Sequence, residues 1–247
     1  MEHGVLCVAA LGWEAAAIVP AIDGAVVSRR GPFTLWKGRG WSAPHWVLRA
    51  GVGPDRAERG VRWALDVVRP TVIASTGCAG ALASGIGIGD VVVADAVVDG
   101  TGKNRATSVE WRERYRRASL TARLAPHEGR ILTSDAVLLS QERKKRAGEV
   151  SGALAVEMEA AAIADWCCSK GIEFSAARVI LDSADMTLAP ELPAILGAEG
   201  YASAPRLLRA LVHRPALLRE LLAVGSAMRT CRRALRCLHR DLIAGLR

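Results

Sequence analysis

Short apolar, β-branched runs alternate with helical patterns along most of the chain, and this alternation limits its possible folds more than any other feature. The strand candidates are Val5–Leu11, His45–Arg49, Thr71–Ser75, Val91–Val98, Ile131–Thr133, Ala153–Val156 and Phe174–Leu181. Helical patterns cover Asp55–Val68, Met158–Lys170 and the sequence after Ala204, with a break at Pro215. Such alternation is typical of a largely parallel sheet with helices on both faces. The sequence therefore predicts an α/β domain.

The junctions between strands and loops are the informative places in such a fold, because ligands bind beyond the carboxyl ends of the strands. Unusual residues gather there. Glu14 follows the first strand, Gly51–Gly53 follows the second, and Ser75–Gly80 follows the third. Asp182 and Asp185 follow the last strand. We expect these residues to meet at one edge of the sheet.

Length and composition fit a folded globular protein with a sizeable core. The chain has 247 residues, of which 51% are apolar and 23% charged, enough for one α/β domain or two small ones. The longest uncharged stretch, Pro70–Gly89, contains five glycines and is interpreted as a buried strand and a loop rather than a transmembrane helix. No basic region precedes the first apolar run, so we expect no signal peptide and a cytoplasmic location.

Cysteine and histidine usage argues against a metal site. None of the six cysteines forms a CxxC pair, and the five histidines are scattered. We expect buried free thiols in a reducing compartment, no bound metal and no organic cofactor.

The net charge of +8 resides in the C-terminal segment. From Tyr201 onward, ten arginines stand against Glu220 and Asp241, so residues 1–200 are neutral overall. We expect a domain over 1–200 and a basic helical segment over 201–247 packed on it. Its basic face is either solvated or attracted to anionic lipid at a membrane surface. Nucleic-acid binding is disfavoured because interleaved aromatic residues and a known binding motif are missing.

The segment Ser75-Thr76-Gly77-Cys78-Ala79-Gly80 is predicted to be a loop. Its small residues allow backbone N–H groups to approach a phosphate, a ribose or a carboxylate closely. A tight turn with positive φ explains it equally well. It is neither a Walker loop nor a dinucleotide-binding fingerprint.

Four carboxylates are candidates for chemistry. Glu157 and Glu159 flank Met158, and either could accept hydrogen bonds from vicinal ribose hydroxyls or interact with a helix dipole. Asp182 follows an apolar strand and could protonate a departing purine at N7 if burial raised its pKa, whereas Asp185 suits a helix cap. Glu14 stands in an apolar setting, where a glutamate is paired, functional or in the first turn of a helix.

Taken in order, these segments resemble the nucleoside phosphorylase and nucleosidase superfamily, especially the methylthioadenosine/adenosylhomocysteine nucleosidases. The similar segments are Ala9–Glu14, Ala50–Pro54, Ser75–Leu82, Ile88–Val93, Ser134–Leu138, Ala155–Ala164 and Arg178–Asp185. The resemblance implies a three-layer α/β/α nucleoside phosphorylase-like fold with a central mixed sheet. It also implies a homodimer or a higher homo-oligomer.

The resemblance also implies roles at the matching positions. Asp182 matches a general acid that protonates N7, and Glu14 matches the base that activates the attacking water. The resemblance implies that Glu159 binds the ribose, with Met158 and Glu157 beside it. The implied nucleophile pocket comprises Val52, Thr76, Gly77, Cys78 and Arg178, and the implied purine pocket comprises Ala79, Gly80, Val137 and Leu138. Cys78 replaces a serine of the family, and Val137 replaces an aromatic residue that packs against the purine.

The expected activity is hydrolysis of the N-glycosidic bond of a purine nucleoside, a 5′-modified adenosine, with release of adenine. Phosphorolysis is the alternative, with phosphate as co-substrate, although Ser75–Cys78 lacks the arginine of bacterial purine nucleoside phosphorylases. Leu188–Glu191 and the tail from Leu211 to Arg236 are also similar to the hopanoid-biosynthesis nucleoside phosphorylases, which cleave adenosylhopane. A non-catalytic nucleoside-binding protein on the same fold is the third hypothesis.

Overall fold

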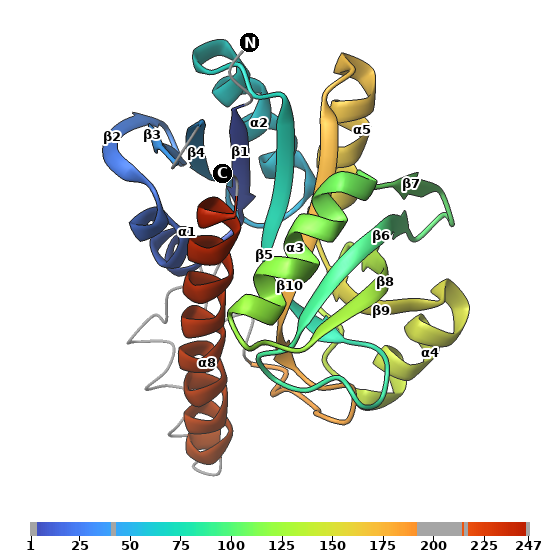
Figure 1. The fold of residues 1–247 in the computed structure, drawn as a ribbon. Coiled ribbons are helices and arrows are strands. Elements are labelled where there is room, and N and C mark those ends of the chain that lie inside the picture. The colour runs from blue at the N-terminus through green and yellow to red at the C-terminus, as the bar shows by residue number, and fades with distance from the viewer. Residues whose placement is uncertain (1–3, 41–42, 192–213, 215–216, 246–247) are drawn as a thin grey trace.

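The computed structural model describes residues 4–40, 43–191, 214 and 217–245, and shows a mixed sheet covered by helices (Figure 1). The strands are β1 (Val5–Ala9), β2 (Asp23–Arg30), β3 (Phe33–Arg39), β4 (Pro44–Arg49), β5 (Val72–Ala81), β6 (Val91–Asp99), β7 (Asn104–Ala106), β8 (Pro126–Thr133), β9 (Ala153–Glu157) and β10 (Glu173–Asp182). The helices are α1 (Gly12–Ile18), α2 (Pro54–Val67), α3 (Val109–Thr121), α4 (Gln141–Ser151), α5 (Ala160–Lys170) and α8 (Leu217–Ala244), with a 3-10 turn at Val19–Ala21.

Strand β5 is the centre of the sheet. The strand order is β10-β6-β8-β9-β5-β1-β4-β3-β2, and β5 also pairs with β10. Strands β5, β10, β6, β8 and β9 are therefore hydrogen-bonded in a closed circuit, and β1, β4, β3 and β2 extend it on one side. Parallel pairs such as β1–β5 coexist with antiparallel pairs such as β5–β9. The predicted α/β class with a central mixed sheet is confirmed.

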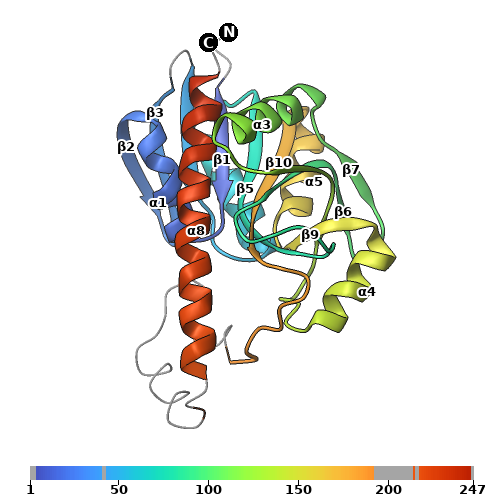
Figure 2. The ribbon, with the colours of Figure 1, turned by 60° about the horizontal axis from the view of Figure 1, so that its bottom comes forward.

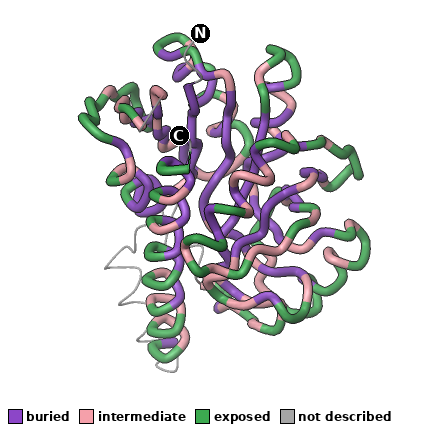
Figure 3. Tube along the Cα trace, in the orientation of Figure 1, coloured by how far each residue is buried: buried purple, intermediate pink, exposed green. Residues whose placement is uncertain are grey.

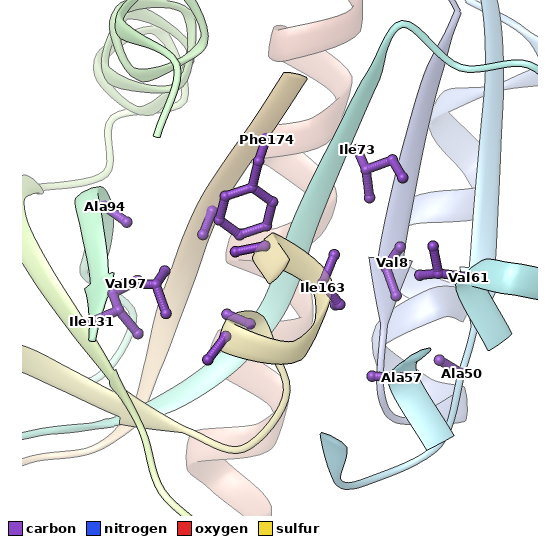
Figure 4. Packing of buried hydrophobic residues seen from close by; sticks show 14 of the residues in the cluster. Val8, Ala50, Ala57, Val61, Ile73, Ala94, Val97, Ile131, Ile163 and Phe174 are labelled. Atoms are coloured by element: carbon purple, nitrogen blue, oxygen red, sulfur yellow. The ribbon is translucent and has the colours of Figure 1, made fainter. Parts of the chain in front are cut away.

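Helices cover both faces of the sheet, and the alternation of side chains along β1 shows why. Leu6 and Val8 pack with α2 and α5 in one hydrophobic cluster, part of which is drawn in Figure 4. Val5 and Cys7 point the other way and pack with α1, α3 and α8 in a second cluster. Because β1 is buried on both faces, its sequence is a continuous run of apolar residues.

Helix α8 forms the basic C-terminal segment and lies against α1, α3 and β10 (Figure 2). Its inner face buries Cys231, Leu235, Leu238 and Leu242, which recur at helical spacing, while its outer face is exposed (Figure 3). The predicted boundary at residue 200 and the residues Leu211–His213 lie outside the described part of the chain. No helix among the described residues is long and apolar enough to cross a membrane.

A buried side-chain pair connects α8 to β5. The hydroxyl of Thr76 and Nε2 of His239 lie 2.9 Å apart, and both residues are buried. Burial lowers the pKa of His239 to about 3, so the imidazole is neutral and one ring nitrogen can accept a hydrogen bond. The ring also meets Tyr115 edge-on. The last helix is thereby fixed to the central strand.

The structure corrects one expected loop and adds elements that the sequence reading omitted. Ser75–Gly80 is not a loop but the second half of β5, paired with β10 and β9. Asp185 caps no helix in the described residues up to 191. Strands β2, β3 and β7 and helices α3 and α4 are further elements that the sequence analysis does not predict. In β2, α3 and α4, exposed or charged residues weaken the hydrophobic periodicity.

Candidate active site

Glu14 is held at the carboxyl end of β1 by two backbone N–H groups. Leu11 N donates to its Oε2 at 2.8 Å, and Cys78 N donates to its Oε1 at 2.7 Å. The first bond satisfies the N–H of Leu11, the residue before α1, so Glu14 does occupy the first turn of a helix. The second bond fastens the same carboxylate to β5. Glu14 is 3% exposed and is therefore a buried acid with a fixed orientation.

Two glycines of β5 make room for carboxylates. A Cβ added at Gly77 would lie 2.8 Å from Oε1 of Glu14, and one added at Gly80 would lie 3.0 Å from Oδ2 of Asp182. The φ of Gly77 is +143°, a conformation that favours glycine. The small residues of this segment thus allow two acids to lie directly against a strand. Glu14 and Asp182 therefore lie against two positions of β5 that are three residues apart.

Asp182 ends β10, where it is paired in register with Gly80. Its carboxylate forms an ion pair with Lys144 of α4, and both side chains are buried. Burial raises the pKa of Asp182, although the neighbouring ammonium acts in the opposite direction. Gly80 also pairs with Val156, the residue before Glu157, so Asp182 and the Glu157–Glu159 segment flank the same part of β5.

Glu159 reaches across to the turn before α2. Its Oε1 accepts a hydrogen bond of 2.8 Å from Gly53 N, and Glu159 is 8% exposed. It stands at the N-terminus of α5 but does not cap that helix with its side chain. Burial first, and then the negative charge of Glu157, raise the pKa of Glu159 to about 8. The carboxylate is therefore costly to ionise without a ligand that donates hydrogen bonds to it.

Glu157, which the resemblance places beside the ribose, has protein partners on both carboxylate oxygens. Its carboxylate accepts hydrogen bonds from Glu159 N and Ala160 N at the start of α5, and so it is Glu157 that interacts with the helix N-terminus. Thr133 donates to Oε1 at 2.5 Å, and Arg178 donates to Oε2 at 2.6 Å. Because both oxygens are already engaged, we assign Glu157 to holding Arg178 and α5 in place.

Arg178 completes this buried charge cluster. Its Nη2 also donates to the hydroxyl of Ser75 at 2.8 Å, and its guanidinium interacts electrostatically with Glu14 and Glu159. One arginine thus stands among three carboxylates. Burial raises the pKa of Glu14 despite the hydrogen bonds from Leu11 and Cys78 and the attraction of Arg178. The cluster can therefore hold protons that isolated glutamates release.

We expect Glu159→Gln to stabilise the protein increasingly as the pH rises from about 4.5 to about 8. Native Glu159 keeps a proton in this window while the unfolded side chain is ionised, so the wild type loses stability with rising pH. Glutamine never ionises and can still accept the hydrogen bond from Gly53. The gain should reach on the order of a few kcal/mol above the window. Urea unfolding at several pH values measures it.

The exposed Glu149→Gln serves as the control for this experiment, because an exposed acid gains little from neutralisation. The control should show no gain that grows with pH. A difference between Glu159→Gln and wild type that stays constant from pH 4.5 to pH 8 would contradict the expected protonation of Glu159.

The side chains of Thr76 and Cys78, which the resemblance assigns to the nucleophile pocket, have partners on α8. The Thr76 hydroxyl pairs with His239, and the Cys78 thiol lies beside the thiol of Cys231, also on α8. Residues two apart on a strand share a face, which explains why both point toward α8. The main chain of Gly77 and Cys78 lies next to Glu14.

All six cysteines are free thiols.

The remaining predicted residues lie around this cluster. Val52 is half-buried beside Gly53, and Met158 is half-buried between the two glutamates. Ala79 is buried in β5. Val137 is 44% exposed, and Leu138 packs against a small cluster that includes Leu82 and Val156. The loop with Val137 and Leu138 joins the segment after Asp182 through a bond from Leu188 N to Leu139 O at 2.7 Å.

Sequence reasoning missed three polar residues of the site. Ser75 lay inside the segment taken for a loop, Thr133 ended a short strand, and Lys144 lay in the basic run Arg143–Arg146, which suggested a solvated surface. Only the fold brings them to the carboxylates.

Within the residues that the structure describes, no three His, Cys, Asp or Glu side chains gather as a set that could hold a metal ion.

Comparison with known proteins places this chain in a family. The family model described as the Phosphorylase superfamily matches residues 5–213. The 5′-methylthioadenosine/S-adenosylhomocysteine nucleosidase of an Exiguobacterium species is 32% identical over 157 residues, which cover 56% of this chain and 67% of the relative. The nucleosidase of the same name from Actinobacillus succinogenes is 30% identical over 156 residues, covering 56% and 68%.

Solved structures share the fold. The nucleosidase of Neisseria meningitidis in complex with methylthio-immucillin-A has a TM-score of 0.77 and 21% identity, covering 98% of this chain and 99% of that one. Futalosine hydrolase of Helicobacter pylori has a TM-score of 0.77 and 17% identity, covering 99% of both chains. The resemblance drawn from the sequence is confirmed, and the chain belongs to the Phosphorylase superfamily.

Proposed function

We propose that this protein hydrolyses the N-glycosidic bond of a 5′-modified adenosine and releases adenine. The observation that carries the proposal is the placement of buried acids along β5, with Glu14 fixed against Gly77, Asp182 against Gly80, and Glu159 bonded to Gly53 beside them. The nucleosidases to which the chain is similar are named for methylthioadenosine and adenosylhomocysteine, both 5′-modified adenosines. Such acids suit the cleavage of a glycosidic bond.

Each acid has a distinct role in the proposed reaction. Asp182 protonates N7 of the purine, so that the base leaves as a neutral molecule while the bond from C1′ to N9 breaks. Glu159 accepts hydrogen bonds from the ribose hydroxyls and orients C1′. Glu14, held by Leu11 and Cys78, accepts a proton from the water that attacks C1′ on the opposite face. Arg178, which is paired with Glu157, also attracts the carboxylates of Glu14 and Glu159.

The charge of the cluster favours water over phosphate as the nucleophile. A phosphate would enter a buried site beside Glu14 and Glu157, where the guanidinium of Arg178 already bonds to Glu157 and Ser75. Bringing an anion next to buried carboxylates is unfavourable, whereas water is neutral and donates hydrogen bonds to them. Phosphorolysis remains the alternative activity.

A product assay tests the proposal. The purified protein is incubated with methylthioadenosine, adenosylhomocysteine, inosine and a long-chain 5′-alkyl adenosine as a mimic of adenosylhopane, each with and without phosphate. Free adenine and a free 5′-modified ribose in phosphate-free buffer support hydrolysis. A sugar 1-phosphate formed only with phosphate supports phosphorolysis. Binding of these nucleosides without release of base would instead identify a non-catalytic nucleoside-binding protein.

We also propose that the outer face of α8 contacts anionic membrane surfaces. Its exposed residues include Leu218 and Leu222 and then the arginines Arg229, Arg232, Arg233, Arg236 and Arg240. Leucines beside arginines favour contact with anionic lipid. This contact fits an enzyme that acts in the cytoplasm on a nucleoside with an apolar 5′ group, such as adenosylhopane.

The variant Arg229→Glu/Arg233→Glu should lose binding to vesicles that contain phosphatidylglycerol in a co-sedimentation assay. Lys145→Glu, an exposed lysine on α4, is the control and should bind like the wild type. Phosphatidylcholine vesicles should bind none of the three proteins. Equal partitioning of wild type and the double variant would show that these arginines of α8 do not contact the membrane.

We also propose that the protein forms a homodimer or a higher homo-oligomer, and light scattering in the same buffers measures its oligomeric state.

A further inference from the structure

Lys144 is a buried lysine in a place where a lysine is costly. It belongs to the first turns of α4, and its side chain has no solvent exposure. Its neighbours Arg143, Lys145 and Arg146 are all exposed, as basic residues on a surface helix are expected to be. Burying an ammonium is unfavourable unless it is paired and fully hydrogen-bonded. The contacts of Lys144 therefore indicate what it does.

All three N–H bonds of the ammonium have acceptors. Nζ pairs with Oδ2 of Asp182 and donates to the carbonyl oxygens of Ser183 at 2.9 Å and Met186 at 2.8 Å. The two carbonyls belong to the turn that directly follows Asp182. One side chain thus fixes both the carboxylate of Asp182 and the backbone that carries it.

We propose that Lys144 is a positioning residue that orients Asp182 and strengthens it as the acid of the reaction. This inference rests on the proposed function, in which Asp182 protonates the departing base. Because Lys144 pairs with Oδ2, a proton taken up by the Asp182 carboxylate before the reaction resides on Oδ1, and the carboxyl group cannot rotate freely. The geometry therefore presents one oxygen of Asp182 to the substrate.

The proton balance shows how Lys144 assists. As the bond from C1′ to N9 breaks, its electron pair moves into the purine. The Oδ1–H bond of Asp182 breaks, an N–H bond forms at N7, and Asp182 becomes a carboxylate. Lys144 remains an ammonium throughout. It attracts the carboxylate that forms more strongly than the neutral acid that is consumed, so it stabilises the transition state relative to the ground state.

The same pair adjusts the strength of the acid. Burial raises the pKa of Asp182, which keeps the proton available, whereas the ammonium of Lys144 lowers it, which keeps the acid strong. Without Lys144, Asp182 would hold its proton more firmly and transfer it more slowly. A residue that served only to pack α4 would have no such effect on the titration of Asp182.

The test compares Lys144→Met with the matched control Lys145→Met, which removes an exposed lysine one position along the same helix. NMR titration of protein labelled at the aspartate side-chain carboxyl carbon, with Asp182 assigned through Asp182→Asn, reads the pKa of Asp182 without turnover. We expect this pKa to rise in Lys144→Met and to stay unchanged in Lys145→Met. The value of kcat/KM for adenine release should fall by about 10–1000-fold in Lys144→Met only.

Lys144→Gln is the second variant, because glutamine can donate to the carbonyls of Ser183 and Met186 but carries no charge. It should also raise the pKa of Asp182, and circular dichroism should show that it is folded. An unchanged Asp182 titration in a folded Lys144 variant overturns the inference. If wild type releases no base from any nucleoside, the proposed function fails by itself, and the titration still reports separately on the Lys144–Asp182 pair.

Discussion

Replacing Asp182 with asparagine should reduce adenine release by about 10²–10⁴-fold while leaving nucleoside binding nearly unchanged. Asparagine has the same shape and retains an oxygen that can accept a hydrogen bond from Lys144. It has no acidic proton to transfer to N7, so the base must leave as an anion. Single-turnover kinetics measure the chemical step, and calorimetry with a nucleoside measures binding.

Asp185→Asn is the matched control, because this exposed aspartate lies only three residues further along the chain. It should release adenine at the wild-type rate. Wild-type turnover in Asp182→Asn would exclude Asp182 as the acid. Loss of binding and turnover together would show that Asp182 organises the site rather than transfers a proton.

Replacing Glu14 with alanine should cause a loss of similar size, about 10²–10⁴-fold in kcat, because it removes the carboxylate that accepts the proton of the attacking water. The variant also leaves the N–H groups of Leu11 and Cys78 without their carboxylate partner. Azide separates these effects, since it is a nucleophile that needs no deprotonation. We expect azide to restore adenine release in Glu14→Ala and to yield a glycosyl azide.

The pH dependence of adenine release should also identify Glu14 as the base. Glu14 must be ionised to act as a base, and burial raises its pKa. The wild-type rate should therefore decline as the pH falls through this raised pKa, and Glu14→Ala with azide should lack that decline. Glu149→Ala, at an exposed position, should behave like the wild type. If the rate of Glu14→Ala with azide still declines as the pH falls, the decline is due to the titration of another group.

Much of the fold could be predicted because burial on both faces leaves a strong pattern in the sequence. The apolar run at Val5–Leu11 contains β1, and the helical pattern at Asp55–Val68 matches α2 apart from one residue at each end. The same logic placed Glu14 and Asp182 near the ends of strands, and the structure brings both to β5. Local patterns suffice where hydrophobic periodicity and position along a strand decide the outcome.

The sequence could not show which polar groups already have partners. Ser75–Gly80 is rich in small residues, which suggested a loop, but they serve the close approach of Glu14 and Asp182 to a central strand. Glu157 and Glu159 look equivalent in sequence, yet only Glu157 bonds to Arg178 and Thr133. Such distinctions depend on contacts between residues far apart in the chain.

The pairing of Thr76 with His239 has a consequence for how the protein matures. Partners separated by 163 positions meet only after all of the polypeptide between them has emerged from the ribosome. Until then, the hydroxyl of Thr76 in the central strand lacks its hydrogen-bond partner, and the apolar side chains on that face of the strand are not covered by α8. Nascent chains that stall before α8 should therefore be captured by chaperones and should not yet bind nucleoside.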